Sequence, residues 1–568
     1  MKGEFVILFI AALIYAAGCG SDTPVNNDKA EEKQPEAALR SAPFSKGVNF
    51  SGWFESSSAG GIPFTNYAEQ DFADVKSLGA DVIRLPVQLH SMTQGEPHYT
   101  IDPLLFKFLD IAVDWAEKYE IYIIIDNHSY DPVLGLRDDI DKILVPVWTQ
   151  VARRYKDRGD YIVYEVLNEP HGISDERWGE VQGMAVQAIR SVDQRHAIIV
   201  GGTDFNSIEK LYALPEYSDP NLIYTFHFYD PFLFTHQGAS WGGPPLLTPL
   251  AGVPFPADRG RMPEIPAEFT GTWVEDSLKY SYVNDAAYST LSGTLDTAVA
   301  FSRKRNVPVF CGEFGVLMNN SHPEDRVKWY AFVADALGKR NISRTSWDYY
   351  GGFGVFNSDR GDFKYDLNTE LVSAMGFAVP EQTKRSREPF KNGFVLFDDY
   401  PNRGYVSCGY WGDSGTTFNL YEANSARGEF AILWGNTNQY NMFWFSFNNG
   451  GDFSYLVSEG YCLEFLARTE RPVKFDVRFV NPENAQSVPW RMRYTIDENI
   501  LPPDGNWHTV RVPLSAMSEH GAWLDAAQSW LEPRGEFSWE NASQLEFVSE
   551  HAAMKNIYIR FDEIKISR

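Results

Sequence analysis

The stretch Tyr161-Ile-Val-Tyr-Glu-Val-Leu-Asn168-Glu169-Pro170 is a short apolar run that stops at a carboxylate. A second stretch, Val307-Pro-Val-Phe-Cys-Gly-Glu313-Phe-Gly, has the same form and stops at Glu313. Each run predicts a buried strand, and in barrel enzymes the ends of the strands carry the reactive side chains. The two glutamates lie far apart in the sequence, so only the fold can bring them together.

Short apolar runs alternate with amphipathic stretches from Lys46 to about Val379. The predicted strands span residues 47–51, 81–85, 121–126, 161–167, 197–200, 222–227, 307–312 and 344–347. The predicted helices include residues 67–78, 103–118, 140–156, 177–192, 286–304 and 323–337. This alternation predicts an α/β fold, a (β/α)8 TIM barrel over residues 44–380. The open doubly wound sheet is disfavoured, because no glycine-rich phosphate-binding motif follows the first strand.

A second domain is indicated where the hydrophobic period changes to two residues. Val473, Phe475, Val477 and Phe479 alternate with polar residues, which is typical of antiparallel strands with one packed face. Residues 389–568 therefore predict an all-β sandwich or jelly roll, joined to the barrel by a polar linker at 381–388. This domain contains Trp411, Trp434, Trp444, Trp490, Trp507, Trp523, Trp530 and Trp539.

The first residues have the form of an export signal. An apolar run from Phe5 to Ala17 is too short for an ordinary membrane span, and it ends in Ala16-Ala17-Gly18-Cys19, which resembles a bacterial lipobox. Residues 1–19 are therefore expected to be a signal peptide with lipidation at Cys19, and residues 20–43 a disordered tether. The protein is predicted to be exported, as a membrane-anchored lipoprotein of the outer membrane or cell surface, or as a secreted protein.

Three cysteines remain after Cys19. Cys311 is expected to be a small buried apolar residue, and an exported compartment would permit a disulfide between Cys408 and Cys462. No cysteine spacing resembles a zinc site. In the second domain Asp398, Asp399 and Asp562 are candidate ligands of a structural Ca²⁺ ion, since oxygen ligands suit that ion.

Composition excludes some partners and favours others. The formal net charge is −26 and no block of Lys and Arg is present, which argues against nucleic-acid binding. Aromatic residues form 15% of the chain, and their flat apolar faces suit pyranose rings, although core packing accounts for many of them. The expected partner is a neutral polysaccharide, with membrane contact only through the lipid and a monomer as the expected state.

Further candidate residues follow the predicted strands in order. Arg84 lies in Val-Ile-Arg-Leu-Pro-Val, His128 in Ile-Asp-Asn-His, and His227 and Tyr229 in Tyr-Thr-Phe-His-Phe-Tyr. Trp347 follows the eighth strand, and Trp241 ends the segment Phe-Thr-His-Gln-Gly-Ala-Ser-Trp in a long connection after the sixth strand. Each residue alone has a structural explanation, such as a salt bridge or a core position. Their joint order at strand ends favours a binding site.

These motifs resemble glycoside hydrolase family 5 over about residues 46–379. The resemblance implies that Glu169, in Asn-Glu-Pro, is the acid/base and that Glu313, in Gly-Glu-Phe-Gly, is the nucleophile. It also implies that the sugar is bound by a set of seven residues: Arg84, His128, Asn168, His227, Tyr229, Trp241 and Trp347. Where many members have a second histidine after His128, this chain has Ser129. No cofactor is expected.

The chemistry of two carboxylates can be stated independently of the resemblance. Glu169 must carry a proton to release the leaving oxygen, and Glu313 must be ionised to attack the anomeric carbon. Arg84 and the Tyr229 hydroxyl would favour the ionised form of Glu313. Double displacement then retains the anomeric configuration.

The substrate is less determined than the reaction. The Phe-Thr-His-Gln-Gly-Ala-Ser-Trp241 segment favours an endo-β-1,4-glucanase, and a β-mannanase or a mixed glucan, glucomannan or xyloglucan hydrolase is the alternative. The long connection after the sixth strand is expected to form one wall of a cleft, and it could also block the cleft for exo action. The second domain resembles carbohydrate-binding modules only generically, and a purely structural role remains open. A non-catalytic glycan-binding lipoprotein is disfavoured, because both carboxylates are present.

Overall fold

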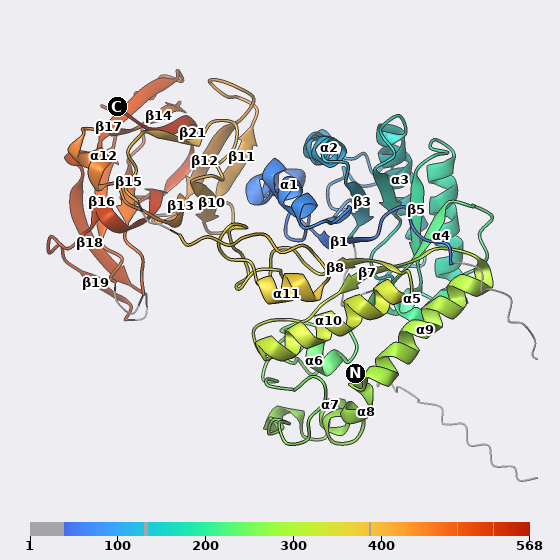
Figure 1. Ribbon diagram of the computed structural model, residues 1–568. Helices are drawn as coiled ribbons and strands as arrows, with labels where there is room; N and C mark the ends of the chain where they lie inside the picture. Colours follow the sequence, from blue (N-terminus) through green and yellow to red (C-terminus); the bar gives the residue numbers. More distant parts are fainter. Residues whose placement is uncertain (1–38, 130–134, 386–387, 485–486, 526) are drawn as a thin grey trace, which may run out of the picture. The chain divides into compact units, whose positions relative to one another are not determined.

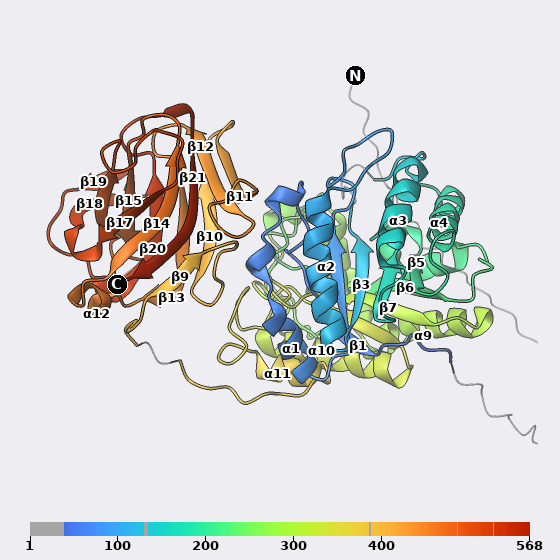
Figure 2. The same cartoon turned by 90° about the horizontal axis from the view of Figure 1, so that it is seen from above.

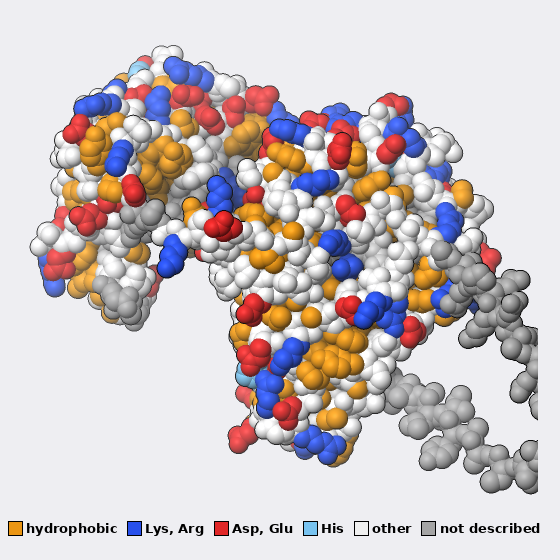
Figure 3. Space-filling model, viewed as in Figure 1, with side chains coloured by type: hydrophobic (Ala, Val, Ile, Leu, Met, Phe, Trp, Pro, Cys, Tyr) orange, Lys and Arg blue, Asp and Glu red, His pale blue; other side chains and the backbone are white. Residues whose placement is uncertain are grey.

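The computed structural model describes residues 39–568 apart from 130–134, 386–387, 485–486 and 526. The predicted signal peptide, Cys19 and nearly all of the predicted tether lie outside the described residues. No helix of the described part is long and apolar enough to cross a membrane. On the face drawn in Figure 3, basic side chains are interspersed with acidic ones.

The first domain is a closed barrel of parallel strands, with helices outside it (Figure 1). All eight predicted strands form, and the (β/α)8 prediction is confirmed. The strands are β1 Lys46–Asn49, β2 Val82–Val87, β3 Tyr122–Asn127, β4 Ile162–Glu165, β5 Ala197–Gly201, β6 Leu222–Phe228, β7 Val309–Phe314 and β8 Ser343–Ser346. Pairing of β1 with β8 closes the barrel, with Gly47 opposite Thr345.

The helices of the barrel match the predicted amphipathic stretches to within a few residues. In α2 the Asp102 side chain accepts a hydrogen bond from Leu104 N and Pro103 occupies the first turn, as expected at a helix N-terminus. The long helices are α1 Glu69–Ser77, α2 Pro103–Lys118, α3 Asp141–Tyr155, α4 Asp175–Arg190, α9 Tyr288–Arg305 and α10 Pro323–Lys339. The short ones are α5 Thr203–Asn206, α6 Phe232–Thr235, α7 Trp273–Asp276, α8 Tyr282–Asp285 and α11 Thr369–Ala374.

The two-residue period of the strands separates the helix-facing side from the barrel interior. Ile83 and Leu85 of β2 belong to the large core that includes the helices, whereas Val82 belongs to a separate buried cluster with Ile124 and Val163. Arg84, Asp126 and Glu165 lie two residues after Val82, Ile124 and Val163, respectively, on the same face of the strands. An aliphatic layer therefore lies beneath a charged layer at the carboxyl ends of the strands.

The second domain is a sandwich of two mainly antiparallel sheets, seen edge-on in Figure 2, and the sequence prediction is confirmed. One sheet consists of β10 Val406–Trp411, β13 Met442–Gly451, β20 Ala542–Val548, β15 Phe475–Val480, β16 Arg491–Ile496, β18 Ser518–Leu524 and β19 Ser529–Leu531. The other consists of β9 Phe394–Phe397, β11 Thr417–Glu422, β12 Ala431–Thr437, β21 Met554–Ser567, β14 Cys462–Thr469 and β17 His508–Pro513. A short helix, α12 Ser454–Ser458, follows β13.

The sandwich core is aromatic. Phe443 stacks on Phe547 with ring centroids 4.5 Å apart, and Phe561 meets both rings edge-on. Trp434 is fully buried among them. The predicted boundary at 381–388 lies between the last barrel helix and β9, and its position stays a prediction.

The disulfide that the sequence permitted between Cys408 and Cys462 does not form. Cys408 lies on β10 and Cys462 on β14, and both are free thiols, as is Cys311. Cys311 is buried, and burial raises the pKa of its thiol, in agreement with an unreactive core residue.

Candidate active site

Arg84 lies at the centre of the charged layer, with no exposed surface. Its Nε is 2.7 Å from Glu165 Oε2, its Nη1 is 2.8 Å from Glu313 Oε1, and its Nη2 is 3.0 Å from Asp126 Oδ2. Nη2 also donates to Asn168 Oδ1 at 2.8 Å. One guanidinium thus joins the ends of β2, β3, β4 and β7, because its rigid fork has donors in several directions.

The charges of this layer compensate one another. Burial alone would lower the pKa of Arg84, but the facing carboxylates hold that pKa well above its usual value. Burial raises the pKa of Glu165 to about 7, against the opposing effect of Arg84. Around neutral pH Arg84 is therefore a permanent cation that faces three acids, and Glu165 titrates within this range.

Glu313 reaches the interior through an irregularity in the strand pairing. The register between β6 and β7 shifts after Phe226 and Cys311, so that His227 pairs with Glu313. Position 312 must be a glycine in this arrangement of the strands, because a Cβ atom there would lie too close to Thr225 Oγ1, at 2.8 Å. Both oxygens of Glu313 are engaged: Oε1 by Arg84, and Oε2 by the Tyr229 hydroxyl at 2.8 Å.

Glu169 follows β4 in a strained backbone conformation. Its φ is 46°, in the left-handed region that is rare for residues other than glycine, and such strain concentrates at functional sites. Its Oε1 lies 2.7 Å from His227 Nδ1. Burial lowers the pKa of His227 to about 4, so this imidazole is neutral at ordinary pH.

The two candidate catalytic carboxylates face each other. One oxygen of Glu169, one oxygen of Glu313 and a nitrogen of His227 all lie within 4.8 Å of one another. Among the described residues this is the only such group close enough to hold a metal ion. Its members already have partners in Arg84, Tyr229 and one another, so the arrangement is explained by protein contacts alone.

His128 and Trp347 form a second part of the site. Their rings stack with centroids 5.6 Å apart and an interplanar angle of 13°. His128 Nδ1 is 2.7 Å from Asp126 Oδ2, and although burial opposes it, this carboxylate raises the pKa of His128 to about 9. His128 Nε2 also lies 3.4 Å from Asn168 Nδ2. The pair therefore places a charged imidazole and an indole beside Asn168.

The long connection after β6 places aromatic rings beside Tyr229, and its role as a cleft wall stays a prediction. His236 meets the Tyr229 ring edge-on at 4.9 Å, and Trp241 lies 6.4 Å from His236 and 6.3 Å from Phe353. Trp241 is 48% exposed. The structure thus connects Trp241 to Tyr229 through the His236 ring.

Sequence reasoning missed several residues of the site. Glu165 and Asp126 could have been inferred, since a buried Arg84 requires buried acids and both follow the strand period. Phe205 could not have been found by motif. It lies in α5, where Asp204, Phe205 and Asn206 all have φ between 56° and 58°. This turn leaves the Phe205 ring 45% exposed and stacked on His171 at 4.4 Å.

Among the described residues, the three predicted calcium ligands, Asp398, Asp399 and Asp562, do not form a cluster that could hold an ion. Asp562 Oδ2 accepts hydrogen bonds from the backbone of Ala426 and Arg427, and Asp399 Oδ1 accepts one from Phe430 N. No group of at least three acidic, histidine or cysteine side chains that includes them is close enough for one ion in the described chain. Their contacts are those of turn-stabilising residues, and structural calcium stays a prediction.

A (β/α)8 barrel with two facing carboxylates at the ends of its fourth and seventh strands defines a glycoside hydrolase. Residues 42–352 match the family model described as cellulase (glycosyl hydrolase family 5), and the chain belongs to that family. It is a cellulase-like glycoside hydrolase.

Similar proteins agree with this assignment. Endoglucanase 3 of Fibrobacter succinogenes is 30% identical over 340 residues, which cover 56% of this chain and 51% of that protein. Endoglucanase H of Acetivibrio thermocellus is 24% identical over 582 residues, covering 98% of this chain and 58% of that protein. The chain thus spans little more than half the length of these two relatives. A solved hyperthermophilic endo-β-1,4-glucanase in complex with substrate has 25% identity and a TM-score of 0.50, covering 59% of this chain and 97% of that one.

Proposed function

We propose that this protein is a retaining, endo-acting glycoside hydrolase that cleaves β-1,4-glucan chains. The observation that carries the proposal is the approach of Glu169 and Glu313 to within 4.8 Å. Retaining enzymes need carboxyl groups about 5–5.5 Å apart, whereas inverting enzymes need about 6.5–9.5 Å to accommodate a water molecule. The short separation supports the retaining mechanism.

In the first step the Glu313 carboxylate attacks the anomeric carbon. The glycosidic bond breaks, and the proton of Glu169 passes to the departing oxygen. Arg84 and Tyr229 each donate to one oxygen of Glu313 and so stabilise its charge before the attack. Asn168, held by Arg84, lies where it can bind the sugar 2-hydroxyl.

In the second step Glu169 acts as a base. Its carboxylate takes a proton from water, the water oxygen attacks the anomeric carbon, and the ester to Glu313 breaks. His227 supports both steps, because it is neutral and 2.7 Å from Glu169 Oε1. Asn206 Nδ2 lies 3.4 Å from His227 Nε2, which favours the tautomer with the proton on Nδ1, donated to Glu169.

The preference for β-1,4-glucan rests on the relatives, which are named endoglucanases, and on the Trp241 segment. Trp347, Trp241 and Phe205 supply exposed or half-buried rings on which successive sugars can stack. The alternative is a β-mannanase or a mixed glucan, glucomannan or xyloglucan hydrolase. Initial rates on soluble cellulose, lichenan, glucomannan and mannan distinguish these substrates. The proposal predicts the highest rate on a β-1,4-linked glucan, and negligible turnover on all glucans would contradict it.

A second function, glycan binding, is favoured for the outer face of the seven-stranded sheet. Trp444, Glu546, Arg478 and Arg493 lie directly opposite one another across β13, β20, β15 and β16. Arg478 is buried between Glu546 and Glu550. Trp411 on the neighbouring strand is 52% exposed. A row of aromatic and hydrogen-bonding side chains on one face suits a glycan chain.

Retention of the full-length protein on insoluble cellulose tests this second function. The Glu313→Gln variant should be used, so that the matrix is not degraded. In this background Trp411→Ala together with Trp444→Ala should reduce retention by at least tenfold. In the wild-type background the same two changes should leave hydrolysis of short soluble substrates unchanged. Unchanged retention would indicate a structural domain.

We also propose export and lipidation at Cys19. The support is the sequence pattern of residues 1–19. Metabolic labelling with a radioactive fatty acid should mark the wild-type protein and not Cys19→Ser. Label in both proteins, or in neither, would contradict lipidation at this residue.

A further inference from the structure

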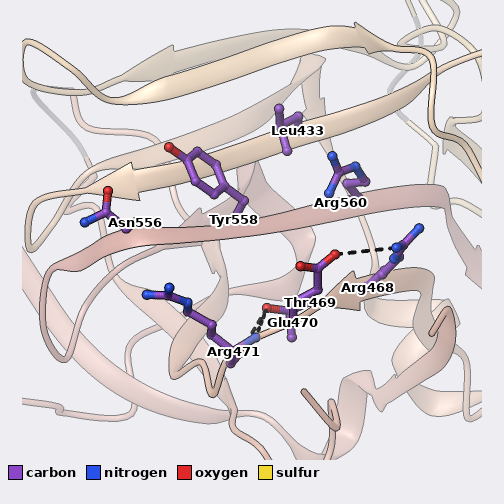
Figure 4. A pocket seen from close by; sticks show the side chains of 8 residues that line it. All are labelled: Leu433, Arg468, Thr469, Glu470, Arg471, Asn556, Tyr558 and Arg560. Carbon is purple, nitrogen blue, oxygen red and sulfur yellow. Dashed lines mark hydrogen bonds and ion pairs between the residues drawn. The ribbon is translucent and has the colours of Figure 1, made fainter. Parts of the chain in front are cut away.

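The second domain contains a hollow on the outer face of its other sheet, the one formed by β12, β21 and β14 (Figure 4). Its volume is about 360 Å³, within the range of small-molecule sites. Its lining includes Leu433, Arg468, Arg471, Asn556, Tyr558 and Arg560. None of these residues takes part in the barrel site or in the tryptophan-bearing face.

Because side chains alternate along a strand, those that line the hollow point away from the sandwich core. Ile559 and Phe561 of β21 are buried in the sandwich core, so Tyr558 and Arg560 point to the opposite face. Arg560 lies directly opposite Leu433 on β12 and directly opposite Arg468 on β14. Two arginines are therefore cross-strand neighbours, an arrangement that repels unless anions compensate it.

The compensation within the protein is incomplete. Arg560 pairs with Glu422 at 3.1 Å. Arg468 has one acidic partner, Glu470 at 3.6 Å, whose side chain is 72% exposed, and its Nη1 donates to Asn424 Oδ1 at 3.4 Å. The buried Nε of Arg468 has no hydrogen-bond partner in the described part of the chain. Because that nitrogen is itself buried, a ligand in the hollow would meet the Nη atoms of Arg468 instead.

Arg471 adds a third positive charge at the rim. Its side chain forms no ion pair with any residue that the structure describes, and it extends along the hollow in Figure 4. This concentration of cations contrasts with the formal net charge of −26 for the chain. Three arginines against the two carboxylates of Glu422 and Glu470 leave a positive excess at the hollow, which favours an anionic ligand.

The remaining lining suits a sugar ring. The Tyr558 side chain is 41% exposed and presents a flat aromatic surface beside Leu433. The Asn556 amide offers both a donor and an acceptor for hydroxyl groups. An inorganic anion would need only the arginines, whereas a sugar acid would use the ring, the amide and the arginines together.

We propose that this hollow binds a saccharide unit that carries a carboxylate, a uronic acid. The carboxylate lies between Arg468 and Arg560, whose guanidinium forks match its geometry, and the pyranose ring packs on Tyr558. The site goes beyond the proposed hydrolysis of neutral glucan. It would hold the enzyme on acidic polysaccharides that accompany its substrate.

Calorimetric titration of the full-length protein with sodium glucuronate tests the proposal. Glucose serves as the neutral probe and inorganic phosphate as the simple anion. Glucuronate should bind at least tenfold more tightly than either, and its affinity should fall with added salt, because the charged contacts are partly exposed. Arg468→Gln, Arg471→Gln and Tyr558→Ala should each weaken glucuronate binding by at least tenfold.

Arg511→Gln is the matched control. Arg511 lies on β17 of the same sheet, pairs with Glu464 and does not line the hollow, so this variant should bind glucuronate normally. All four variants should hydrolyse soluble glucan at the wild-type rate, which separates this proposal from the proposed function. Arg471 is exposed and unpaired in the described chain, so Arg471→Gln preserves the fold even if Arg468→Gln does not.

Three results would overturn the proposal. The first is no saturable binding of glucuronate. The second is binding that survives Arg471→Gln and, where that variant folds, Arg468→Gln. The third is phosphate binding as tight as glucuronate binding, with no effect of Tyr558→Ala, which would define a site for simple anions.

Discussion

Arg84 Nε and Glu165 Oε2 lie 2.7 Å apart, and both side chains are essentially inaccessible to solvent. This buried pair fixes the position of the Arg84 guanidinium, which also contacts Glu313 and Asn168 and so positions both side chains. Removing one partner of a buried ion pair leaves an uncompensated charge, so the pair links the stability of the barrel to its chemistry.

Arg84→Gln should lower the free energy of unfolding by about 3–5 kcal/mol at pH 8, since three acids lose their common cation. The loss should be smaller at pH 5, where Glu165, with a pKa raised to about 7, is protonated. Urea denaturation at both pH values measures this. Arg344→Gln, on β8 outside the charged layer, is the control, and an equal loss in both variants would contradict the role of Arg84.

Glu313→Gln should reduce kcat by several orders of magnitude while leaving glucan binding largely intact. The amide cannot act as the nucleophile, but it keeps the shape of the carboxylate. Its oxygen can accept from Arg84, and its NH2 group can donate to the Tyr229 hydroxyl oxygen. Stopped rate assays with soluble cellulose give kcat, and titration with a cello-oligosaccharide gives binding. Full activity in this variant would show that Glu313 is not the nucleophile.

Phe205 should act as a stacking surface on the leaving-group side of the site. It packs on His171, whose Nδ1 lies 2.9 Å from the backbone oxygen of Glu169. Phe205→Gly should lower kcat/KM on oligosaccharides about two- to tenfold, from the loss of about 0.5–1.5 kcal/mol of ring stacking. It should not lower Tm, because glycine relieves the left-handed backbone.

Phe205→Tyr is the conservative control and should keep the activity on oligosaccharides. A parallel fall of Tm and kcat/KM in Phe205→Gly would instead indicate a purely structural residue. Unchanged kcat/KM with a raised Tm would leave the strained turn without a role in binding.

The stability should depend on pH through His128. Its pKa is raised from 6.5 to about 9 by Asp126, so the pair stabilises the fold fully below pH 6.5 and loses this contribution as the pH rises through 9. The difference in unfolding free energy between wild type and His128→Gln should therefore shrink by about 3 kcal/mol between pH 6 and pH 10. A constant difference across this range would contradict a charged His128.

Much of this architecture could be predicted from the sequence, because the hydrophobic periods of helices and of strands both follow from backbone geometry. The barrel strands alternate helix-facing and interior residues, and this period places Asp126 of β3 and Glu165 of β4 on the same face as Arg84. The C-terminal alternation of Val473, Phe475, Val477 and Phe479 likewise identified one packed face. Residue types at strand ends could thus be assigned to one site.

What the sequence could not show depends on the path of the chain between elements. The exposed Phe205 results from a left-handed turn whose residues carry no glycine signal. The separation of Cys408 and Cys462 depends on which sheet each strand joins, and spacing does not encode that. The arginine-lined hollow arises from cross-strand register between β12, β21 and β14, which is likewise set only by folding.

The stereochemistry of the first product tests the central claim most directly. Proton NMR of a cello-oligosaccharide during the first minutes of hydrolysis distinguishes the two anomers before they interconvert. Double displacement through Glu313 and Glu169 predicts that the β-anomer appears first and the α-anomer only later by mutarotation. Initial formation of the α-anomer would show inversion and contradict the assignment of Glu313 as a nucleophile.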